Sequence, residues 1–332
     1  MCVGTGGHVL PVKNIINELI NYGIEEKNII VITDKRGNEF LKLEKIEVEI
    51  KEFFITNKGV KGYLKNITKL LASVIEIRKF LKDKSVKIIF TTGAYIAPIA
   101  AIVSKLIRSK FYIQEQNIYA GYGNKVSAHF ASKIFTSFKD TKNIKVKNIM
   151  FAGPIVNTNL NSQDLLIKSI KTISFIGGSQ GSKDINKLAL DFLNHPISKN
   201  FKVLHITGKG NMNLEIKNEN YIQYEYVEDM DNIYKITDLV IGRSGGGSLE
   251  PAFLGIPQLL IPYKHGTTSD HQRLNAEFLE KKGLGIIVHS FSDMLDCIIK
   301  LSDNLNEHFR NDQVLQKGNK IVSKEIYDQF FR

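Results

Sequence analysis

The chain has 332 residues, 43% hydrophobic and 24% charged, which is the balance of a folded protein long enough for two domains. Its two cysteines, Cys2 and Cys297, lie far apart without metal-ligand spacing, which excludes a disulfide framework and suits a reducing compartment. The longest apolar stretch, residues 93–103, is well short of the roughly 18 residues of a spanning helix, and no signal-peptide pattern is present. We therefore expect a cytoplasmic protein.

Charge is unevenly distributed along the chain. Residues 1–150 hold 25 Lys and Arg against 13 Asp and Glu, whereas residues 151–332 hold 20 against 21. Within the first half, residues 51–150 alone hold 19 against 5. Such asymmetry favours an anionic partner for the N-terminal half, and because no nucleic-acid-reading motif is present we expect an acidic membrane and no nucleic acid. A lysine-rich composition without a functional meaning is the alternative.

Strand-like and helix-like segments alternate along the chain. Helical periodicity over 11–22, 63–82 and 183–193 separates apolar runs at 28–33, 86–91, 110–114, 133–138, 172–176, 203–207, 239–241 and 258–261. This alternation predicts an α/β fold of parallel sheets with crossover helices. A polar, turn-rich segment at 153–163 interrupts the series. We place the domain boundary there, giving domains 1–153 and 154–315, and packing of a C-terminal helix, 316–332, back on the first domain is open.

Each half opens with a glycine-rich loop that leads into a predicted helix, at residues 4–8 and 177–181. Such loops let backbone N–H groups approach an anion, although many serve only a steric purpose. The third position of the dinucleotide fingerprint holds Val9 and Ser182 instead of glycine, and Ser182-Lys183 does not complete a P-loop. NAD and ATP are therefore disfavoured. A third loop, residues 243–250, carries three glycines and Glu250, whose carboxylate suits two ribose hydroxyls or a simple helix-terminal charge.

Taken together, these segments resemble the MurG family, the UDP-N-acetylglucosamine:lipid-I transferases of peptidoglycan synthesis. The matching segments are 4–11 (GTGGHVLP), 92–95 (TGAY), 114–117 (QEQN), 176–181 (IGGSQG), 227–230 (VEDM), 243–245 (RSG), 255–257 (GIP) and 271–276 (HQRLNA). The resemblance implies a GT-B fold, with two Rossmann-like doubly wound domains and an interdomain cleft. It also implies inverting transfer of N-acetylglucosamine from UDP-N-acetylglucosamine to lipid I, in cell-wall synthesis and hence cell shape and division.

The resemblance also implies roles by position. On the acceptor side it places His8 as catalytic base, with Thr5, Gly6, Gly7, Tyr95 and Asn117 around it. On the donor side it places Ser179, Gln180 and Gly181 at the diphosphate, the backbone of Val227 at uracil, Glu250 at the ribose, and Gln272 and Asn275 at the sugar hydroxyls or fixing that loop. Met230 and Ser248 are further substrate-binding positions to which it gives no separate role.

Three departures from the family pattern stand out. Only three residues precede Gly4, where the family has a full buried strand, so either coding starts further upstream, which we prefer, or the strand is short. The segment 153–156 lacks the family's arginine, which leaves one phosphate contact in doubt. The stretch from Gly245 to Glu250 is one residue shorter than in the family, so Ser248 has no certain match.

Inversion requires one displacement with a base, and His8 has a suitable intrinsic pKa, although it could equally be a structural residue of its loop. The triplet Asp229-Met230-Asp231 resembles a metal-binding Asp-x-Asp, but it precedes a helical pattern, and we read it as helix capping. We expect no metal and no cofactor. The rival functions are another GT-B enzyme, such as a glycolipid synthase or a UDP-N-acetylglucosamine 2-epimerase, and a UDP-sugar-binding scaffold.

A lipid-linked acceptor requires approach to a membrane. Segments 58–84 and 99–110 combine apolar and basic positions that suit peripheral binding to the cytoplasmic face of a bacterial membrane, although their apolar faces could instead pack on the sheet. The apolar positions are Leu64, Ile67, Leu71, Val74, Ile75, Ile99, Ile102, Val103 and Leu106, and the basic ones Lys61, Lys65, Lys69, Arg78, Lys79, Arg108 and Lys110. Partner enzymes of the cell wall are a further possibility that the sequence leaves open.

Overall fold

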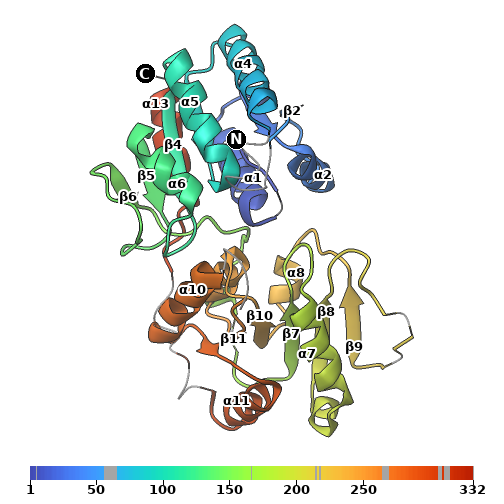
Figure 1. Ribbon diagram of the computed structural model, residues 1–332. Helices are drawn as coiled ribbons and strands as arrows, with labels where there is room; N and C mark the ends of the chain where they lie inside the picture. Colours follow the sequence, from blue (N-terminus) through green and yellow to red (C-terminus); the bar gives the residue numbers. More distant parts are fainter. Residues whose placement is uncertain are drawn as a thin grey trace. The chain divides into compact units, whose positions relative to one another are not determined.

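The computed structural model describes residues 1–4, 6–55, 66–165, 167–213, 215–216, 218–263, 269–305, 309 and 315–331. The chain forms two compact units, unit 1 with Met1–Val156 and Lys317–Arg332, and unit 2 with Asn157–Gln316. The chain leaves unit 1 three residues after the expected boundary, and the last helix, α13 (Asn319–Phe330), belongs to unit 1 (Figure 1). Every strand pairing within the described ranges is parallel.

Unit 1 is built on two parallel sheets, a pair β1-β2 and a four-stranded sheet in the order β3-β4-β5-β6. The strands are β1 (Ile30–Thr33), β2 (Glu49–Glu52), β3 (Ile88–Thr91), β4 (Lys110–Glu115), β5 (Lys133–Thr136) and β6 (Ile149–Phe151). The helices besides α13 are α1 (Gly6–Asn21), α2 (Lys35–Leu43), α4 (Ile67–Asp83), α5 (Ala97–Ile107) and α6 (Tyr122–Ser127).

The larger sheet of unit 1 is covered on both faces. Phe111 and Ile113 of β4 pack into a core with α4 and α5, whereas Tyr112 between them packs into a second core with α1 and α13. Successive side chains of a strand point to opposite faces, so a near-continuous apolar run is what a sheet buried on both sides requires. This explains why β4 reads as an unbroken buried strand.

Unit 2 has a single six-stranded sheet in the order β12-β11-β10-β7-β8-β9. The strands are β7 (Thr172–Ile176), β8 (Lys202–Ile206), β9 (Tyr221–Tyr224), β10 (Leu239–Gly242), β11 (Gln258–Leu260) and β12 (Ile286–Ile287). The helices are α7 (Lys183–Asn194), α8 (Asp231–Tyr234), α9 (Leu249–Leu254), α10 (Ser269–Lys281) and α11 (Phe291–Asp303). The strand order runs in opposite directions on the two sides of the neighbouring strands β7 and β10. In sheets of this kind, ligands bind beyond the carboxyl ends of the strands at this switch point.

Candidate active site

Asp34 joins three loops at the carboxyl edge of the strands of unit 1. It directly follows β1, and its Oδ1 accepts hydrogen bonds from the backbone nitrogens of Gly4, at 3.1 Å, and Gly37, at 2.9 Å, the latter as the N-cap of α2. Its Oδ2 accepts a hydrogen bond of 2.5 Å from the hydroxyl of Tyr95. The glycine loop and Tyr95 are therefore held by one buried carboxylate. The sequence analysis missed Asp34, although an aspartate between a strand and a helix is a capping signal.

His8 lies in the first turn of α1 and is tied to the loop after β3. Its Nδ1 is 3.0 Å from the carbonyl oxygen of Thr92, and the hydroxyl of Thr92 donates to the carbonyl oxygen of His8 at 2.7 Å. A carbonyl oxygen only accepts, so Nδ1 carries the hydrogen and the neutral ring has its lone pair on Nε2. That tautomer leaves Nε2 as the basic atom of the ring.

The predicted segment 114–117 organises the loop after β4. The buried carboxylate of Glu115 accepts from the backbone nitrogen and Nδ2 of Asn117, at 2.9 and 3.1 Å, and from Nδ2 of Asn124, at 2.8 Å. Gln116 instead donates to the carbonyl oxygen of Ile155 at 3.0 Å. Glu115 and Gln116 thus fix the backbone of the loop that carries Asn117. This loop follows β4, which pairs with β3, the strand that precedes Tyr95.

The two predicted glycines of unit 1, Gly6 and Gly7, lie in the first turn of α1, with Gly6 buried and Gly7 exposed. The backbone N–H groups of a helix's first turn have no partner within the helix and suit an anion. Thr5, the remaining predicted residue of this loop, lies outside the described residues.

In unit 2 the loop 177–181 connects β7 to α7 and is tightly packed. Gly181 has φ +72°, and a Cβ there would lie 2.1 Å from the carbonyl oxygen of Thr207. Ser182 begins the helix as its N-cap by accepting from the backbone nitrogen of Ile185. The predicted Ser179 is half-buried and Gln180 exposed, next to the start of α7. The loop can therefore present backbone N–H groups and a helix N-terminus to a phosphate.

Arg243, the first residue after β10, contacts the end of this loop and the first turn of α7. Its Nε donates to Oγ of Ser182 at 3.0 Å, and its guanidinium pairs with Asp184. It also donates to the carbonyl oxygen of Ile261 at 3.2 Å and lies 5.0 Å from the ring centre of Tyr263. The sequence analysis assigned no role to Arg243, although its place at the carboxyl end of a strand signals a site residue.

Gln272 and Asn275, both on α10, contact the loop that follows β10. Nδ2 of the buried Asn275 donates to the carbonyl oxygen of Ser244 at 3.1 Å, and Oε1 of Gln272 accepts from the nitrogen of Tyr263 at 2.9 Å. Ser248 is also buried and donates to the carbonyl oxygen of Gly245 at 2.7 Å. Nδ2 of Asn275 and the backbone carbonyl oxygen of Gln272, which accepts from the hydroxyl of Ser244 at 2.7 Å, thus hold the loop after β10, and the Gln272 side chain contacts the segment after β11. Contact of Gln272 and Asn275 with the sugar hydroxyls stays a prediction.

Glu250, in the first turn of α9, is anchored from within unit 2. Its Oε1 accepts from the nitrogen of Asn157 at 3.0 Å, and its Oε2 accepts from the hydroxyl of Tyr234 at 2.9 Å. Burial and the Glu250 charge raise the pKa of Tyr234 well above its usual value, so Tyr234 stays a neutral donor. Ribose binding by Glu250 stays a prediction.

The segment before α8 holds the other predicted donor residues. Val227 and Met230 pack partly buried against Leu204, Ile206 and Ile233. Oδ1 of Asp229 accepts from the nitrogen of Asp231 at 3.1 Å, and Oδ2 accepts from Nδ2 of Asn232 at 3.1 Å, both at the start of α8. The carboxylate of Asp231 accepts from the nitrogen of Asn159 at 2.9 Å. Both aspartates therefore hold backbone in place.

The buried His205 of β8 is linked through Asn186 to the backbone beside the loop 177–181. His205 Nδ1 lies 2.8 Å from the hydroxyl of Tyr221, and Nε2 lies 3.0 Å from Oδ1 of Asn186. Nδ2 of Asn186 donates to the carbonyl oxygen of Thr207, the atom next to Gly181. Burial lowers the pKa of His205 to about 4 and raises that of Tyr221 to about 12, so both are neutral near pH 7.

The predicted site residues thus fall into two groups, each at the carboxyl edge of a parallel sheet. In unit 1, Gly6, Gly7 and His8 lie in the first turn of α1, Tyr95 follows β3 and Asn117 follows β4. In unit 2, Ser179, Gln180 and Gly181 follow β7, Val227 and Met230 follow β9, and Ser248 and Glu250 follow β10. Gln272 and Asn275 lie on α10, where they contact Tyr263 and Ser244.

Comparison with known proteins agrees with this division. Residues 1–136 match the glycosyltransferase family 28 N-terminal domain, and residues 172–328 match the C-terminal domain of the same family. A Staphylococcus aureus (strain MRSA252) UDP-N-acetylglucosamine--N-acetylmuramyl-(pentapeptide) pyrophosphoryl-undecaprenol N-acetylglucosamine transferase is 30% identical over 296 residues, which cover 84% of this chain and 82% of the relative.

Two solved structures share the fold over 98% of both chains. Acinetobacter baumannii MurG superposes with a TM-score of 0.74 at 22% identity. Neisseria meningitidis UDP-GlcNAc 2-epimerase bound to UDP-GlcNAc superposes with a TM-score of 0.69 at 14% identity. The predicted GT-B class of two parallel α/β domains is confirmed, and on its sequence similarity the chain belongs to the MurG family of glycosyltransferases.

Proposed function

We propose that the chain transfers N-acetylglucosamine from UDP-N-acetylglucosamine to lipid I, the undecaprenyl-diphosphate-linked N-acetylmuramoyl-pentapeptide, giving lipid II. The single observation that carries the proposal is the 30% identity, over 296 residues spanning both units, to a transferase whose name states this reaction. Such a similarity over both domains favours the transferase over the epimerases, whose likeness is in the fold alone.

On the donor side, unit 2 supplies the groups that a UDP-sugar needs. The N–H groups of loop 177–181 and the N-terminus of α7 would meet the diphosphate charge, with Ser179 beside them. Glu250 would accept ribose hydroxyls, and the backbone near Val227 and Met230 would contact uracil. Charge on the leaving UDP would then be stabilised by fixed dipoles, and no metal is assigned a role.

On the acceptor side, His8 would act as the base of an inverting displacement. The acceptor hydroxyl oxygen attacks the anomeric carbon of the sugar, the bond from that carbon to the UDP oxygen breaks, and the hydroxyl proton passes to Nε2 of His8. The Thr92 carbonyl 3.0 Å from Nδ1 fixes the tautomer and steadies the imidazolium that forms. Tyr95 and Asn117, held by Asp34 and Glu115, would orient the acceptor.

A lipid-linked acceptor also calls for a membrane-facing surface, and α4 and α5 offer one in unit 1. Ile67, Leu71 and Ile75 are 51, 57 and 64% exposed and recur every fourth residue, so they form one stripe along α4. Ile102 and Leu106 of α5 are each 50% exposed, and α5 packs on α4. We call these five residues the apolar stripe. Of the other predicted positions, Ile99 and Val103 are buried and Val74 packs against the core, whereas Leu64 lies outside the described residues.

Exposed basic side chains lie on the same two helices as the apolar stripe. Lys69 and Lys79 lie on α4 and Lys105 on α5, with Arg108 at its end, while Lys61 and Lys65 lie outside the described residues. Exposed apolar side chains with a basic rim suit the interface of an anionic membrane, and each basic residue near the surface contributes about 1 kcal/mol. We therefore place the protein at the cytoplasmic face of the bacterial membrane. Within the described ranges, no helix has the length and apolar character needed to span a bilayer.

The test of the proposed reaction is release of UDP from UDP-N-acetylglucosamine with a lipid-I analogue, in the presence of EDTA. We expect release that depends on the acceptor and persists in EDTA. Loss of release in EDTA that Mg²⁺ restores would contradict the metal-free mechanism but not the transfer. Acceptor-independent conversion would favour an epimerase, and UDP binding without turnover would favour a UDP-sugar-binding scaffold.

A further inference from the structure

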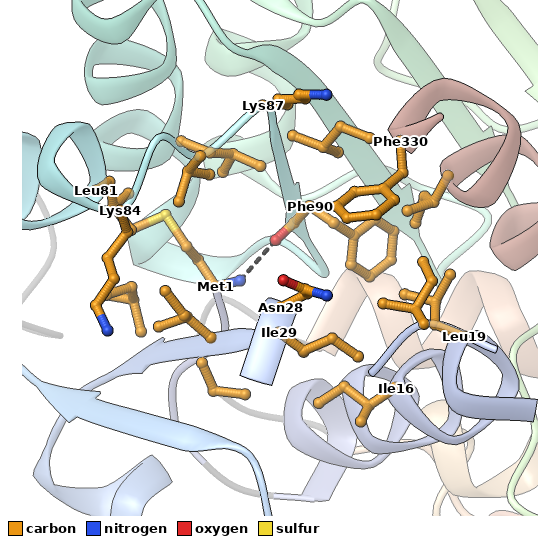
Figure 2. A pocket seen from close by; sticks show the side chains of 18 of the residues that line it. Met1, Ile16, Leu19, Asn28, Ile29, Leu81, Lys84, Lys87, Phe90 and Phe330 are labelled. Carbon is orange, nitrogen blue, oxygen red and sulfur yellow. Dashed lines mark hydrogen bonds between the residues drawn. The ribbon is translucent and has the colours of Figure 1, made fainter. Parts of the chain in front are cut away.

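A cavity of about 350 Å³ lies inside unit 1 between β1 and β3 (Figure 2). Each buried side chain among the described residues that line it is apolar, with Ile16 and Leu19 of α1 and Leu81 of α4 among them. A polar ligand would therefore find no buried hydrogen-bonding side chain there. In unit 2, by contrast, hydrogen-bonded side chains connect β9 through β8 to α7.

The hydrogen bonds that connect these three elements can run in only one direction. Nδ2 of Asn186 donates to the carbonyl oxygen of Thr207 at 2.9 Å, because a carbonyl oxygen only accepts. Oδ1 of Asn186 therefore faces Nε2 of His205, 3.0 Å away, and since Oδ1 also only accepts, Nε2 carries the hydrogen. Burial lowers the pKa of His205 to about 4 and keeps the ring neutral, so Nδ1 accepts from the hydroxyl of Tyr221 at 2.8 Å. The chain of donors runs from Tyr221 through His205 and Asn186 to Thr207.

The Thr207 carbonyl at the end of this chain lies against the loop 177–181. A Cβ on Gly181 would be 2.1 Å from the carbonyl oxygen of Thr207, and a Cβ on Gly208 would be 2.4 Å from the nitrogen of Gly181. The two backbone segments therefore touch each other directly. The position of the loop thus depends on the peptide group that Asn186 holds.

Asn186 also joins this contact to α7. It is the fourth residue of the helix, and its backbone nitrogen donates to the carbonyl oxygen of Ser182, the N-cap, at 2.8 Å. One residue thus takes part in the first turn of α7 and, through Thr207, in the packing of the loop 177–181. The loop and this helix N-terminus are the two sources of backbone N–H groups assigned above to the diphosphate.

We propose that His205 and Asn186 are positioning residues for the sugar donor, which set the shape in which the loop 177–181 receives its diphosphate. The proposal rests on the function proposed above. His205 is 2% exposed, so it acts through Asn186 and not by touching the donor. Uridine lacks the diphosphate, and the groups proposed for uracil and ribose lie after β9 and on α9. Its binding should therefore not depend on this chain of hydrogen bonds.

Two amide substitutions of His205 test the proposal. The amide of His205→Gln reaches about as far as Nε2 and can still donate to Asn186, whereas that of His205→Asn ends near the position of Nδ1 and leaves Asn186 without its donor. We expect His205→Asn to weaken UDP binding about tenfold or more and His205→Gln to weaken it at most about threefold, with uridine binding unchanged in both. Calorimetry measures UDP binding, and ligand-detected NMR measures uridine binding. UDP binding by His205→Asn as tight as by His205→Gln, or an equal loss for uridine and UDP, would overturn the proposal.

Replacement of Asn186 tests the next link of the chain. Asn186→Leu keeps a side chain of similar shape but removes both hydrogen bonds, and it should weaken UDP binding about tenfold or more without changing uridine binding. It should also raise KM for UDP-N-acetylglucosamine and leave KM for the lipid-I analogue unchanged, which a loss of folded enzyme would not do. Asn194→Leu, the same change at the exposed last residue of α7, is the control and should leave both affinities unchanged. An Asn186→Leu protein with the UDP affinity of this control would overturn the proposal.

UDP binding by the unaltered chain separates the two proposals. If the unaltered chain binds no UDP, the proposed function fails, and the role assigned to His205 and Asn186 fails with it. If it binds UDP and the His205→Asn and Asn186→Leu variants bind UDP equally tightly, only the positioning role fails. Uridine binding shows in the same samples that unit 2 of each variant is folded.

Discussion

At the scale of the residue, His8 is the assignment with the sharpest consequence. Replacing His8 with Gln should lower kcat about a hundredfold or more, because a positioned general base contributes about that much and glutamine cannot take the proton. UDP affinity should stay unchanged, because the predicted donor residues all lie in unit 2. Steady-state kinetics and calorimetry measure the two effects. His129→Gln, at an exposed position of the same unit, is the control, and a His8→Gln enzyme as fast as that control would remove His8 from the chemistry.

His205 should make stability depend on pH. Its pKa is about 4 in the folded protein and about 6.5 when unfolded, so between these values the unfolded state binds more protons. The contribution is therefore complete above pH 6.5 and falls as pH drops toward 4. We expect the free energy of unfolding to be about 2 kcal/mol lower at pH 5 than at pH 7.5 from this group. Urea titration at both values should show a smaller drop for His205→Gln than for His129→Gln, and equal drops would contradict the argument.

At the scale of the element, the apolar stripe on α4 and α5 should carry membrane binding. Leu71→Asp with Ile75→Asp should weaken binding to phosphatidylglycerol vesicles at least tenfold, because two exposed apolar side chains are lost and two negative charges are added. Vesicle co-sedimentation measures the loss. Ile299→Asp, at an isoleucine of α11 in unit 2 that is 45% exposed, should have no effect. Equal binding by all variants would mean that this stripe does not face the membrane.

Two glycines of the loop between β7 and α7 should lose different amounts of stability when each is replaced by alanine. Gly178 and Gly181 both have positive φ, but a Cβ on Gly178 meets open space and one on Gly181 meets the Thr207 carbonyl. Gly181→Ala should therefore cost more than the roughly 1–3 kcal/mol of backbone strain, and Gly178→Ala only that strain. Thermal unfolding and UDP titration of the two variants measure the difference. Equal losses would show that the close contact adds nothing.

The elements that the sequence predicts are those whose pattern is local. The apolar runs of β4 and β7 and the glycines of loop 177–181 indicate buried strands and a tight turn at once. Edge strand β2 has the sequence Glu-Ile-Lys-Glu and is half-exposed, so no apolar run in the sequence indicates a strand there. Contacts such as Asp34 with Tyr95 join residues 61 positions apart, and their pairing depends on strand order, which composition does not encode.

At the scale of the whole molecule, the chain passes from unit 1 to unit 2 and back, so the last helix completes the first unit. The buried Asn319 at the start of α13 accepts from the nitrogen of Val156 and donates to its carbonyl oxygen, each at 3.0 Å. Val322 and Ile326 continue the contact by packing in the core with α1. The two segments of unit 1, residues 1–156 and 317–332, are thus hydrogen-bonded to each other at Val156, the last residue before unit 2.

Removing the hydrogen bonds between Asn319 and Val156 should lower the stability of unit 1 more than that of unit 2. Asn319→Ala leaves two buried backbone groups without this partner and should lower the stability of unit 1 by about 2 kcal/mol. Unit 2 contains no part of α13, so its affinity for UDP should be unchanged. Limited proteolysis with mapping of the cleavage sites, together with UDP titration, separates these outcomes, and Lys320→Ala at the exposed neighbouring position is the control. Cleavage that rises equally in both units would mean that the domains unfold as one cooperative body, with α13 holding the whole chain and not unit 1 alone.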